Sequence, residues 1–203
     1  MLPAGQPVKR AASGIARTFQ TPRVIGEASV LENVMIGGSI EGRANFVEAM
    51  LALPRNGADE RLLAAKARAL LGVVGLEALA DVRADRLQHS ELRFIEIARA
   101  LMLDPDFLLL DEPASGLDVA GREDLVTRLD ELAASELAPA VVMVTHHLEE
   151  VPPGFTHALL LRDGGVVAAG PIESTLTEEH LSAAFGTDLK VTRTGGRYTA
   201  VAR

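Results

Sequence analysis

Two spacings of apolar residues divide the chain into regions. Between Ala58 and Val74 the apolar side chains recur every three or four positions, which is the spacing of one helix face. Three shorter runs are continuously apolar, and such runs are typical of strands buried on both faces; they cover residues 107–110, 140–144 and 158–161. We therefore expect a helical region, then strands alternating with helices, which indicates a mostly parallel sheet covered on both sides.

Local signals place the boundaries of further elements. Ser29 and Glu32 form a capping-box pattern, which predicts a helix that runs to about Met35 and is closed by Gly37 and Gly38. Further helices are expected over residues 90–103, 120–134 and 177–185, a short strand over 14–19, and hairpins around the turns at 163–165 and 195–196. Ser90 is a residue type that can cap the helix it begins.

Composition removes several classes of function. The 203 residues carry a formal net charge of −8, and binding to nucleic acid needs clustered basic residues, so a nucleic-acid partner is not expected. Cysteine is absent, which excludes disulfides and thiol catalysis. No apolar run approaches the ~18 residues of a membrane span, so a role at a membrane would have to come through a partner protein.

A pair of acidic residues follows the first apolar run, in the string FLLLDEPASGLD at residues 107–118. Open α/β sheets bind ligands at the carboxyl ends of their strands. There, Asp111 would suit Mg²⁺ and Glu112 would suit a base that activates water. An isolated acidic pair more often only ends a strand and begins a turn. The longer string resembles the Walker B and D-loop segments of ABC ATPases, which favours the functional interpretation.

Three other segments match the same family. Thr145 and His146 follow the second apolar run and resemble its switch histidine, whereas a surface histidine is the ordinary alternative. GIARTFQTPRV at residues 14–24, which contains Gln20, resembles the Q-loop region of branched-chain amino acid importer ATPases. LQHSELRFIEIARAL at 87–101 resembles the ABC signature and its helix, although Gln88, His89, Ser90 and Glu91 depart from the usual signature.

The phosphate-binding loop of this family has no counterpart in the sequence. That loop requires the pattern Gly-x-x-x-x-Gly-Lys-Ser/Thr, and none of the three lysines, Lys9, Lys66 and Lys190, follows a glycine. The resemblance begins just before Gln20 and runs to the end of the chain. It implies an N-terminally truncated subunit, in which this chain alone would hydrolyse little or no ATP.

The resemblance implies an α/β fold: a partial RecA-like P-loop NTPase core with an inserted helical subdomain. We expect a core remnant with the Q-loop at residues 1–20, the helical subdomain and signature helix at 21–103, and the remaining core at 104–203. The cofactors would be ATP and Mg²⁺. The partners would be a second ABC ATPase subunit and a transmembrane permease, which places the protein in the cytoplasm on the inner face of the membrane.

The resemblance also implies residue roles. Asp111 and Gln20 would hold Mg²⁺, Glu112 would polarise water, and His146 and Gln20 would sense the γ-phosphate. Asp118 would couple the two nucleotide sites of a dimer, and the signature residues 88–91 would contact the nucleotide held by the other subunit.

The cargo and two other functions stay open. The first half resembles branched-chain amino acid importers, whereas residues 145–171 resemble a different group of bacterial ABC ATPases. The altered signature suggests a catalytically silent partner subunit. A soluble, non-transport ABC ATPase is the other alternative.

Overall fold

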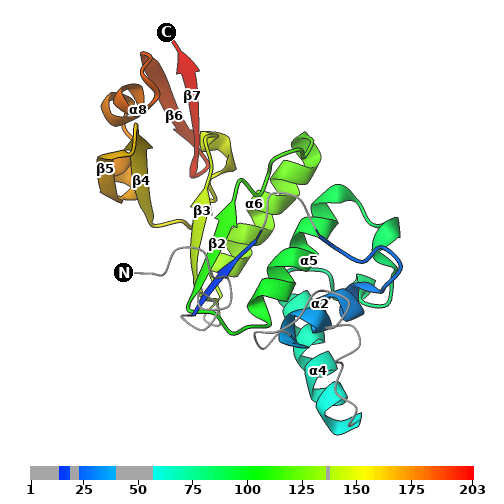
Figure 1. Cartoon of the computed structure of the whole chain (residues 1–203). Coiled ribbons are helices and arrows are strands. Elements are labelled where there is room, and N and C mark those ends of the chain that lie inside the picture. The colour runs from blue at the N-terminus through cyan, green and yellow to red at the C-terminus, as the bar shows by residue number, and fades with distance from the viewer. Residues whose placement is uncertain (1–13, 19–22, 40–56, 136–137) are drawn as a thin grey trace.

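The central sheet has three parallel strands. The computed structural model describes residues 14–18, 23–39, 57–135 and 138–203 (Figure 1). Strand β2 (Phe107–Asp111) lies between β1 (Ile15–Arg17) and β3 (Ala140–Val144). The register pairs Ile15 with Phe107 and Asp111 with Val144. The strands predicted from the apolar runs at 107–110 and 140–144 are therefore present, and their carboxyl ends meet at one edge.

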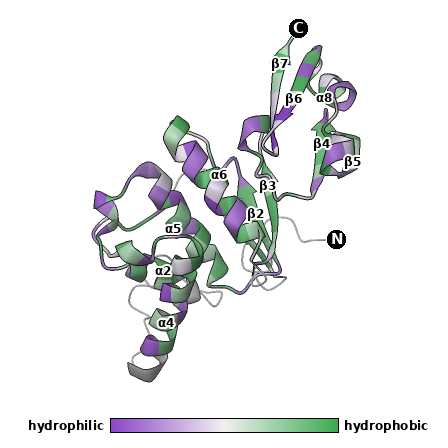
Figure 2. Ribbon diagram, turned by 180° about the vertical axis from the view of Figure 1, so that it is seen from behind, coloured by the Kyte–Doolittle hydropathy of each residue, from purple (hydrophilic) through white to green (hydrophobic). Residues whose placement is uncertain are grey.

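Only one face of this sheet is covered by the described residues. Helices α5 (His89–Leu101) and α6 (Val119–Ala133) lie on the same side of the strands (Figure 1). Leu108 and Leu110 are fully buried, whereas Phe107, Val142 and Val144 are 50%, 48% and 47% exposed. Apolar residues along β2 and β3 are visible in Figure 2. The expectation of a sheet covered on both faces is wrong for this part of the chain, because no described helix packs on the second side.

The capping box at the first helix is confirmed. Helix α2 (Val30–Ser39) begins after Ser29, whose Oγ accepts from the Glu32 N–H at 3.1 Å. The Glu32 carboxylate accepts from the Ser29 N–H at 2.7 Å in return. These two hydrogen bonds satisfy backbone donors that a helix N-terminus otherwise leaves open.

The end predicted for this helix is wrong. Gly37 and Gly38 lie inside α2, which continues to Ser39. A Cβ on Gly37 would lie 2.3 Å from the Arg99 carbonyl oxygen of α5, and a Cβ on Gly38 would lie 2.5 Å from Leu63 Cδ1 of α4 (Gly57–Val73). These glycines allow close helix packing, so they do not act as a stop signal here.

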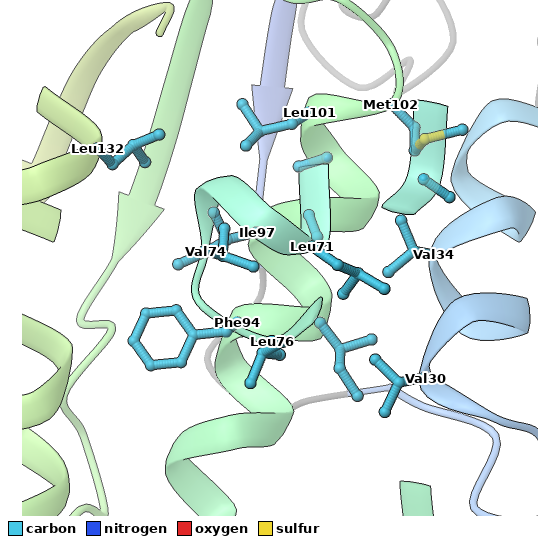
Figure 3. Packing of buried hydrophobic residues seen from close by; sticks show 14 of the residues in the cluster. Val30, Val34, Leu71, Val74, Leu76, Phe94, Ile97, Leu101, Met102 and Leu132 are labelled. Atoms are coloured by element: carbon cyan, nitrogen blue, oxygen red, sulfur yellow. The ribbon is translucent and has the colours of Figure 1, made fainter. Parts of the chain in front are cut away.

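The region from α4 to α6 otherwise follows the apolar pattern. Helix α4 covers the predicted stripe, and short 3-10 turns, η1 (Glu77–Leu79) and η2 (Ala84–Arg86), lead to α5. The helices and the parallel strands share one hydrophobic cluster. It includes Val30 of α2, Leu71 of α4, Leu108 of β2 and Leu125 of α6. Figure 3 shows this packing around Phe94 and Ile97. The proposed division at residues 103 and 104 stays a prediction, and it does not separate two cores.

The C-terminal part has a second hydrophobic cluster formed by Ile172, Leu176, Leu181, Leu189 and Tyr198. Its residues come from two antiparallel hairpins and two helices, which follow the 3-10 turn η3 in the sequence. The elements are η3 (Leu148–Glu150), β4 (His157–Arg162), β5 (Gly165–Pro171), α7 (Ile172–Thr175), α8 (Glu178–Phe185), β6 (Leu189–Thr194) and β7 (Arg197–Ala202). Both predicted hairpins and the predicted helix at 177–185 are confirmed.

One strand in this part differs from expectation. The run at 158–161 pairs only with β5, antiparallel, and does not join the parallel sheet. Asp163 and Gly164 have positive φ angles of 50° and 76° and close the hairpin tightly. The local turn therefore decides the partner of this strand, which the apolar pattern alone could not. Among the helices of the described residues, none combines the length and apolar character needed to cross a bilayer.

Candidate functional site

A pocket lies at the carboxyl end of the parallel sheet. Its volume is about 280 Å³. It collects side chains from the turn after β2, the start of α6 and the turn after β3, and its lining residues are Glu112, Ala114, Ser115, Gly116, Leu117, Arg122, Thr145, His146, His147 and Glu150. This is the edge at which open α/β sheets bind ligands. Two predicted catalytic residues, Glu112 and His146, therefore line one pocket.

Glu112 and His146 are in direct contact. Glu112 Oε1 lies 3.0 Å from His146 Nδ1, although the residues are separated by 34 positions in sequence. The Glu112 N–H donates to the Val144 carbonyl oxygen at 2.8 Å, which extends the β2–β3 pairing by one residue. Glu112 also has a φ of 45°, a conformation that few non-glycine residues adopt and that occurs often at functional sites. The parallel pairing of β2 and β3 thus brings the two groups together.

Asp111 forms an ion pair that the motif did not reveal. Its Oδ2 accepts from Arg17 Nη2 at 2.6 Å, and the Asp111 side chain is 27% exposed. Arg17 ends β1 and pairs in register with Leu109, two residues before Asp111. The partner could have been found only by combining the order of the strands with their register.

The turn that carries His146 is held by a buried carboxylate. Thr145 Oγ1 donates to Glu150 Oε2 at 2.5 Å and accepts from the His147 N–H at 3.0 Å. Glu150 is only 7% exposed. The His146 and His147 rings lie 4.0 Å apart, centroid to centroid. The neighbouring His147 is half-exposed and lines the pocket as well.

Arg122 contributes the positive charge of the pocket. It is the fourth residue of α6, and its Nη1 lies 3.7 Å from Glu149 Oε1 in η3. Arg197 of β7 donates to the Glu123 carboxylate at 2.9 Å and to the Glu149 carbonyl oxygen. The β6–β7 hairpin therefore links the segment after β3 to α6 by hydrogen bonds. Sequence reasoning overlooked Arg122, although it follows the SGLD string by four residues.

Asp118 serves as the N-cap of α6. Its Oδ1 accepts from the Gly121 N–H at 2.8 Å, the kind of hydrogen bond for which aspartate is favoured at this position. The adjoining Gly116 has a φ of 79°. The pocket lining includes Gly116 and Leu117 but not Asp118. The role of Asp118 in coupling two nucleotide sites stays a prediction.

The four signature residues lie apart from this pocket, at the start of α5. Gln88 is the N-cap, and its N–H donates to Glu91 Oε2 at 2.7 Å. The alternative in which Ser90 caps the helix is wrong, because Ser90 is inside α5 and 8% exposed. The Ser90 Cβ lies 3.4 Å from where a Cβ on Gly121 would be, so Ser90 packs against α6. His89 is exposed.

The sequence predicted Asp111 and Gln20 as ligands of Mg²⁺. Gln20 lies outside the described residues. Within residues 14–18, 23–39, 57–135 and 138–203, no three His, Asp or Glu side chains converge as a metal-binding cluster. Mg²⁺ at nucleotide sites is usually held by one or two carboxylates together with phosphate oxygens. The Asp111 carboxylate fits that requirement, with one oxygen shared with Arg17.

Comparison with known proteins agrees with the motifs. The family model described as ABC transporter matches residues 3–115. An ABC transporter ATP-binding protein of Bacillus subtilis, YlmA, is 45% identical over 126 residues, which is 62% of this chain and 48% of YlmA. The branched-chain amino acid transport ATP-binding protein BraF of Pseudomonas aeruginosa is 31% identical over 81% of this chain and 64% of BraF.

Other relatives and solved structures extend this result. The molybdenum import ATP-binding protein ModC of Aromatoleum aromaticum is 36% identical over 81% of this chain and 41% of ModC. The ADP conformation of MJ1267, an ATP-binding cassette of an ABC transporter, superimposes with a TM-score of 0.71 at 26% identity, covering 89% of this chain and 71% of that one. The chain spans about half the length of the first curated relatives it matches. On the family match and this likeness of fold, the chain belongs to the ATP-binding proteins of the ABC transporter family.

Proposed function

We propose that this protein is an ATP-binding subunit of an ABC transporter and that the pocket after β2 and β3 receives the terminal phosphates of ATP. The observation that carries the proposal is the 3.0 Å contact between Glu112 Oε1 and His146 Nδ1 at the carboxyl ends of adjacent parallel strands. A carboxylate and an imidazole at this edge can orient a water molecule and donate a hydrogen bond to a phosphate oxygen.

The residue roles in this proposal are those that the resemblance to the family implies. Glu112 accepts a hydrogen bond from the attacking water, and His146 donates one to the γ-phosphate through its second ring nitrogen. Asp111 and Gln20 hold Mg²⁺, which would neutralise charge on the phosphates. Asp118 couples the pocket to a second subunit. Residues 88–91 contact a nucleotide bound to that second subunit.

Hydrolysis by this chain alone is expected to be slight. Phosphoryl transfer depends on backbone amides and a lysine that stabilise the developing charge, and the 203-residue sequence contains no Gly-x-x-x-x-Gly-Lys-Ser/Thr pattern. We therefore expect weak nucleotide binding and little turnover. Robust ATP hydrolysis that is lost in Glu112→Gln would contradict this part of the proposal.

Nucleotide binding can be tested separately from hydrolysis. In an NMR titration with MgATP at millimolar concentrations, the ring signals of His146 should shift while those of His157 stay in place. His157 is a matched control, because it lies at the start of β4 and its Nδ1 contacts Thr156 Oγ1. Equal shifts at both rings, or none at His146, would refute the proposed site.

The cargo and the partners are proposals as well. We propose import of branched-chain amino acids, because the Gln20 region resembles importers of that class and BraF is 31% identical. The protein would work with a permease and a second ATPase subunit on the inner face of the membrane. Co-purification of the tagged protein with a permease and uptake assays with labelled leucine and molybdate would separate this cargo from that named for ModC.

A catalytically silent partner subunit is a second candidate, favoured by one observation. The Glu91 carboxylate accepts from the Gln88 N–H at the start of α5, where an anionic ligand would otherwise bind. In a heterodimer with a complete ATPase subunit, Glu112→Gln in this chain would leave turnover unchanged. A loss of turnover in that variant would exclude the silent role.

A further inference from the structure

Beyond its polar first turn, helix α5 carries three charged residues at three-residue spacing among apolar ones. Arg93 and Glu96 are only 5% and 8% exposed, and Arg99 follows one turn later, partly buried. Their neighbours along the helix, such as Phe94 and Ile95, belong to the main hydrophobic cluster. We call Arg93, Glu96 and Arg99 the α5 spine.

The first end of the α5 spine contacts the pocket. Arg93 Nη2 donates to the Ser115 carbonyl oxygen at 3.3 Å, and Ser115 lines the pocket that contains Glu112. The other terminal nitrogen of Arg93 lies 3.9 Å from Glu96 Oε2. One guanidinium group therefore hydrogen-bonds to the loop after β2 and attracts the next member of the spine by charge, without a hydrogen bond between them.

The second end holds the segment that follows Gln20. Glu96 Oε1 accepts from the Arg23 N–H at 2.8 Å, and Arg99 Nη1 donates to the Arg23 carbonyl oxygen at 2.6 Å. Arg99 also donates to Asn33 Oδ1 at 2.9 Å, and that oxygen accepts from the Ile25 N–H at 2.8 Å. Asn33 is fully buried. Residues 23–25 are thus hydrogen-bonded to α5 and α2 through their backbone.

Packing alone does not account for charged residues here. Removing charges from water carries a cost that buried ion pairs often fail to recover, and apolar residues of similar volume commonly stabilise a fold as well or better. Burial lowers the pKa of Arg93 and raises the pKa of Glu96, as that cost requires. What charged groups supply is directional hydrogen bonding to two separate backbone segments, and this fixes their relative position.

We propose that the α5 spine positions the Ser115 loop of the pocket relative to residues 23–25, so that a change in one segment is transmitted to the other through Arg93, Glu96 and Arg99. The functional meaning of this coupling rests on the proposed nucleotide site, because the spine would link Glu112 and its loop to residues 23–25. Arg93, Glu96 and Arg99 are positioning residues in this proposal, since none of them lines the pocket.

The coupling can be tested without nucleotide, so its failure is distinct from failure of the proposed function. Gly116→Ala perturbs the peptide unit next to Ser115, because Gly116 has a φ of 79° while a Cβ there meets nothing within 4 Å. Amide exchange of Arg23 and Ile25, measured by NMR, reports the far end. With the spine intact, Gly116→Ala should change the exchange rate of the Arg23 amide by roughly threefold or more. In an Arg93→Met background the same change should disappear.

Control variants keep the test specific. Arg93→Lys retains the charge but not the two-pronged guanidinium, so the effect of Gly116→Ala should be reduced without being lost. Arg68→Met removes an arginine ion pair elsewhere, between Arg68 and Asp81, and should leave the effect intact. If Arg93→Met does not fold, as judged by circular dichroism, the double variant Arg93→Met with Glu96→Gln replaces it. An unchanged response at Arg23 without Arg93, or no response in the intact spine, would overturn the proposal.

Discussion

At the scale of single residues, motif reasoning found the groups that meet and missed their partners. Glu112 and His146 follow apolar runs directly, so a parallel pairing was enough to predict that they lie together, and they lie 3.0 Å apart. Arg17 and Arg122 could not be predicted in the same way. Their contacts with Asp111 and Glu149 depend on strand register and on how η3 packs against α6, and neither is encoded in a local pattern.

Glu96 should make stability depend on pH with an unusual sign. Burial raises its pKa above the ordinary value of 4.5, although the Arg23 N–H and the charge of Arg93 act in the opposite direction. As pH rises from below 4.5, the unfolded chain releases this proton first, so the folded state loses stability until the pH exceeds the raised value. Glu96→Gln should remove this loss, and urea unfolding between about pH 2 and 8 measures it.

The matched control for that prediction is Glu32. Hydrogen bonds from the Ser29 backbone and side chain lower its pKa. Its contribution to stability is therefore present above the ordinary value and lost as pH falls through the lowered one. Glu32→Gln should change the pH dependence in the opposite direction to Glu96→Gln. The same direction for both variants would contradict the assignment.

At the scale of elements, signals that act within a few residues predict the structure correctly. The capping box before α2, the turn at Asp163 and Gly164 and the extent of α8 all follow from local hydrogen bonding and backbone preference. The end of α2 was misjudged, because Gly37 and Gly38 respond to neighbouring helices. A glycine in a helical sequence can mark the end of the helix or a close contact with a neighbouring helix. Only the packing of the folded protein shows which of the two applies.

Gly37→Ala should therefore destabilise the protein. The added Cβ would lie 2.3 Å from the Arg99 carbonyl oxygen, a backbone atom that cannot move without shifting α5. We expect a loss of ~1–3 kcal/mol in the free energy of unfolding, the usual cost of overpacking. Gly72→Ala in α4 is the control, because its Cβ would meet only Glu77 Oε2 at 3.6 Å; it should stabilise the helix by ~0.5–1 kcal/mol. A larger loss from Gly72→Ala would refute this account.

At the scale of the whole molecule, the chain is built around two hydrophobic clusters joined by polar contacts. The first contains the helical part and the parallel strands, and the second lies in the C-terminal hairpins. Between them, Arg197 reaches Glu123 of α6 and the carbonyl oxygen of Glu149. The motifs predicted the family and the parallel strands. The turns predicted the two C-terminal hairpins, whereas the apolar run at 158–161 did not indicate that its strand would stay outside the parallel sheet.

Two substitutions should show whether these clusters unfold separately. Leu181 and Leu71 are both fully buried, one in each cluster. Each change to alanine should cost ~2–5 kcal/mol. Leu181→Ala should accelerate hydrogen exchange in β4–β7 while α5 stays protected, and Leu71→Ala should do the reverse. Faster exchange throughout the chain in both variants would show a single cooperative unit instead.

The uncovered face of β2 and β3 has a practical consequence for work with the isolated polypeptide. Phe107, Val142 and Val144 expose apolar surface beside the unpaired outer edge of β3, within the sheet as described. An exposed edge strand can pair with a strand of another molecule. Concentrated solutions should therefore become turbid through intermolecular pairing. Val142→Lys would place a charge on that exposed face, which should oppose association of molecules and keep the protein in solution for the NMR experiments.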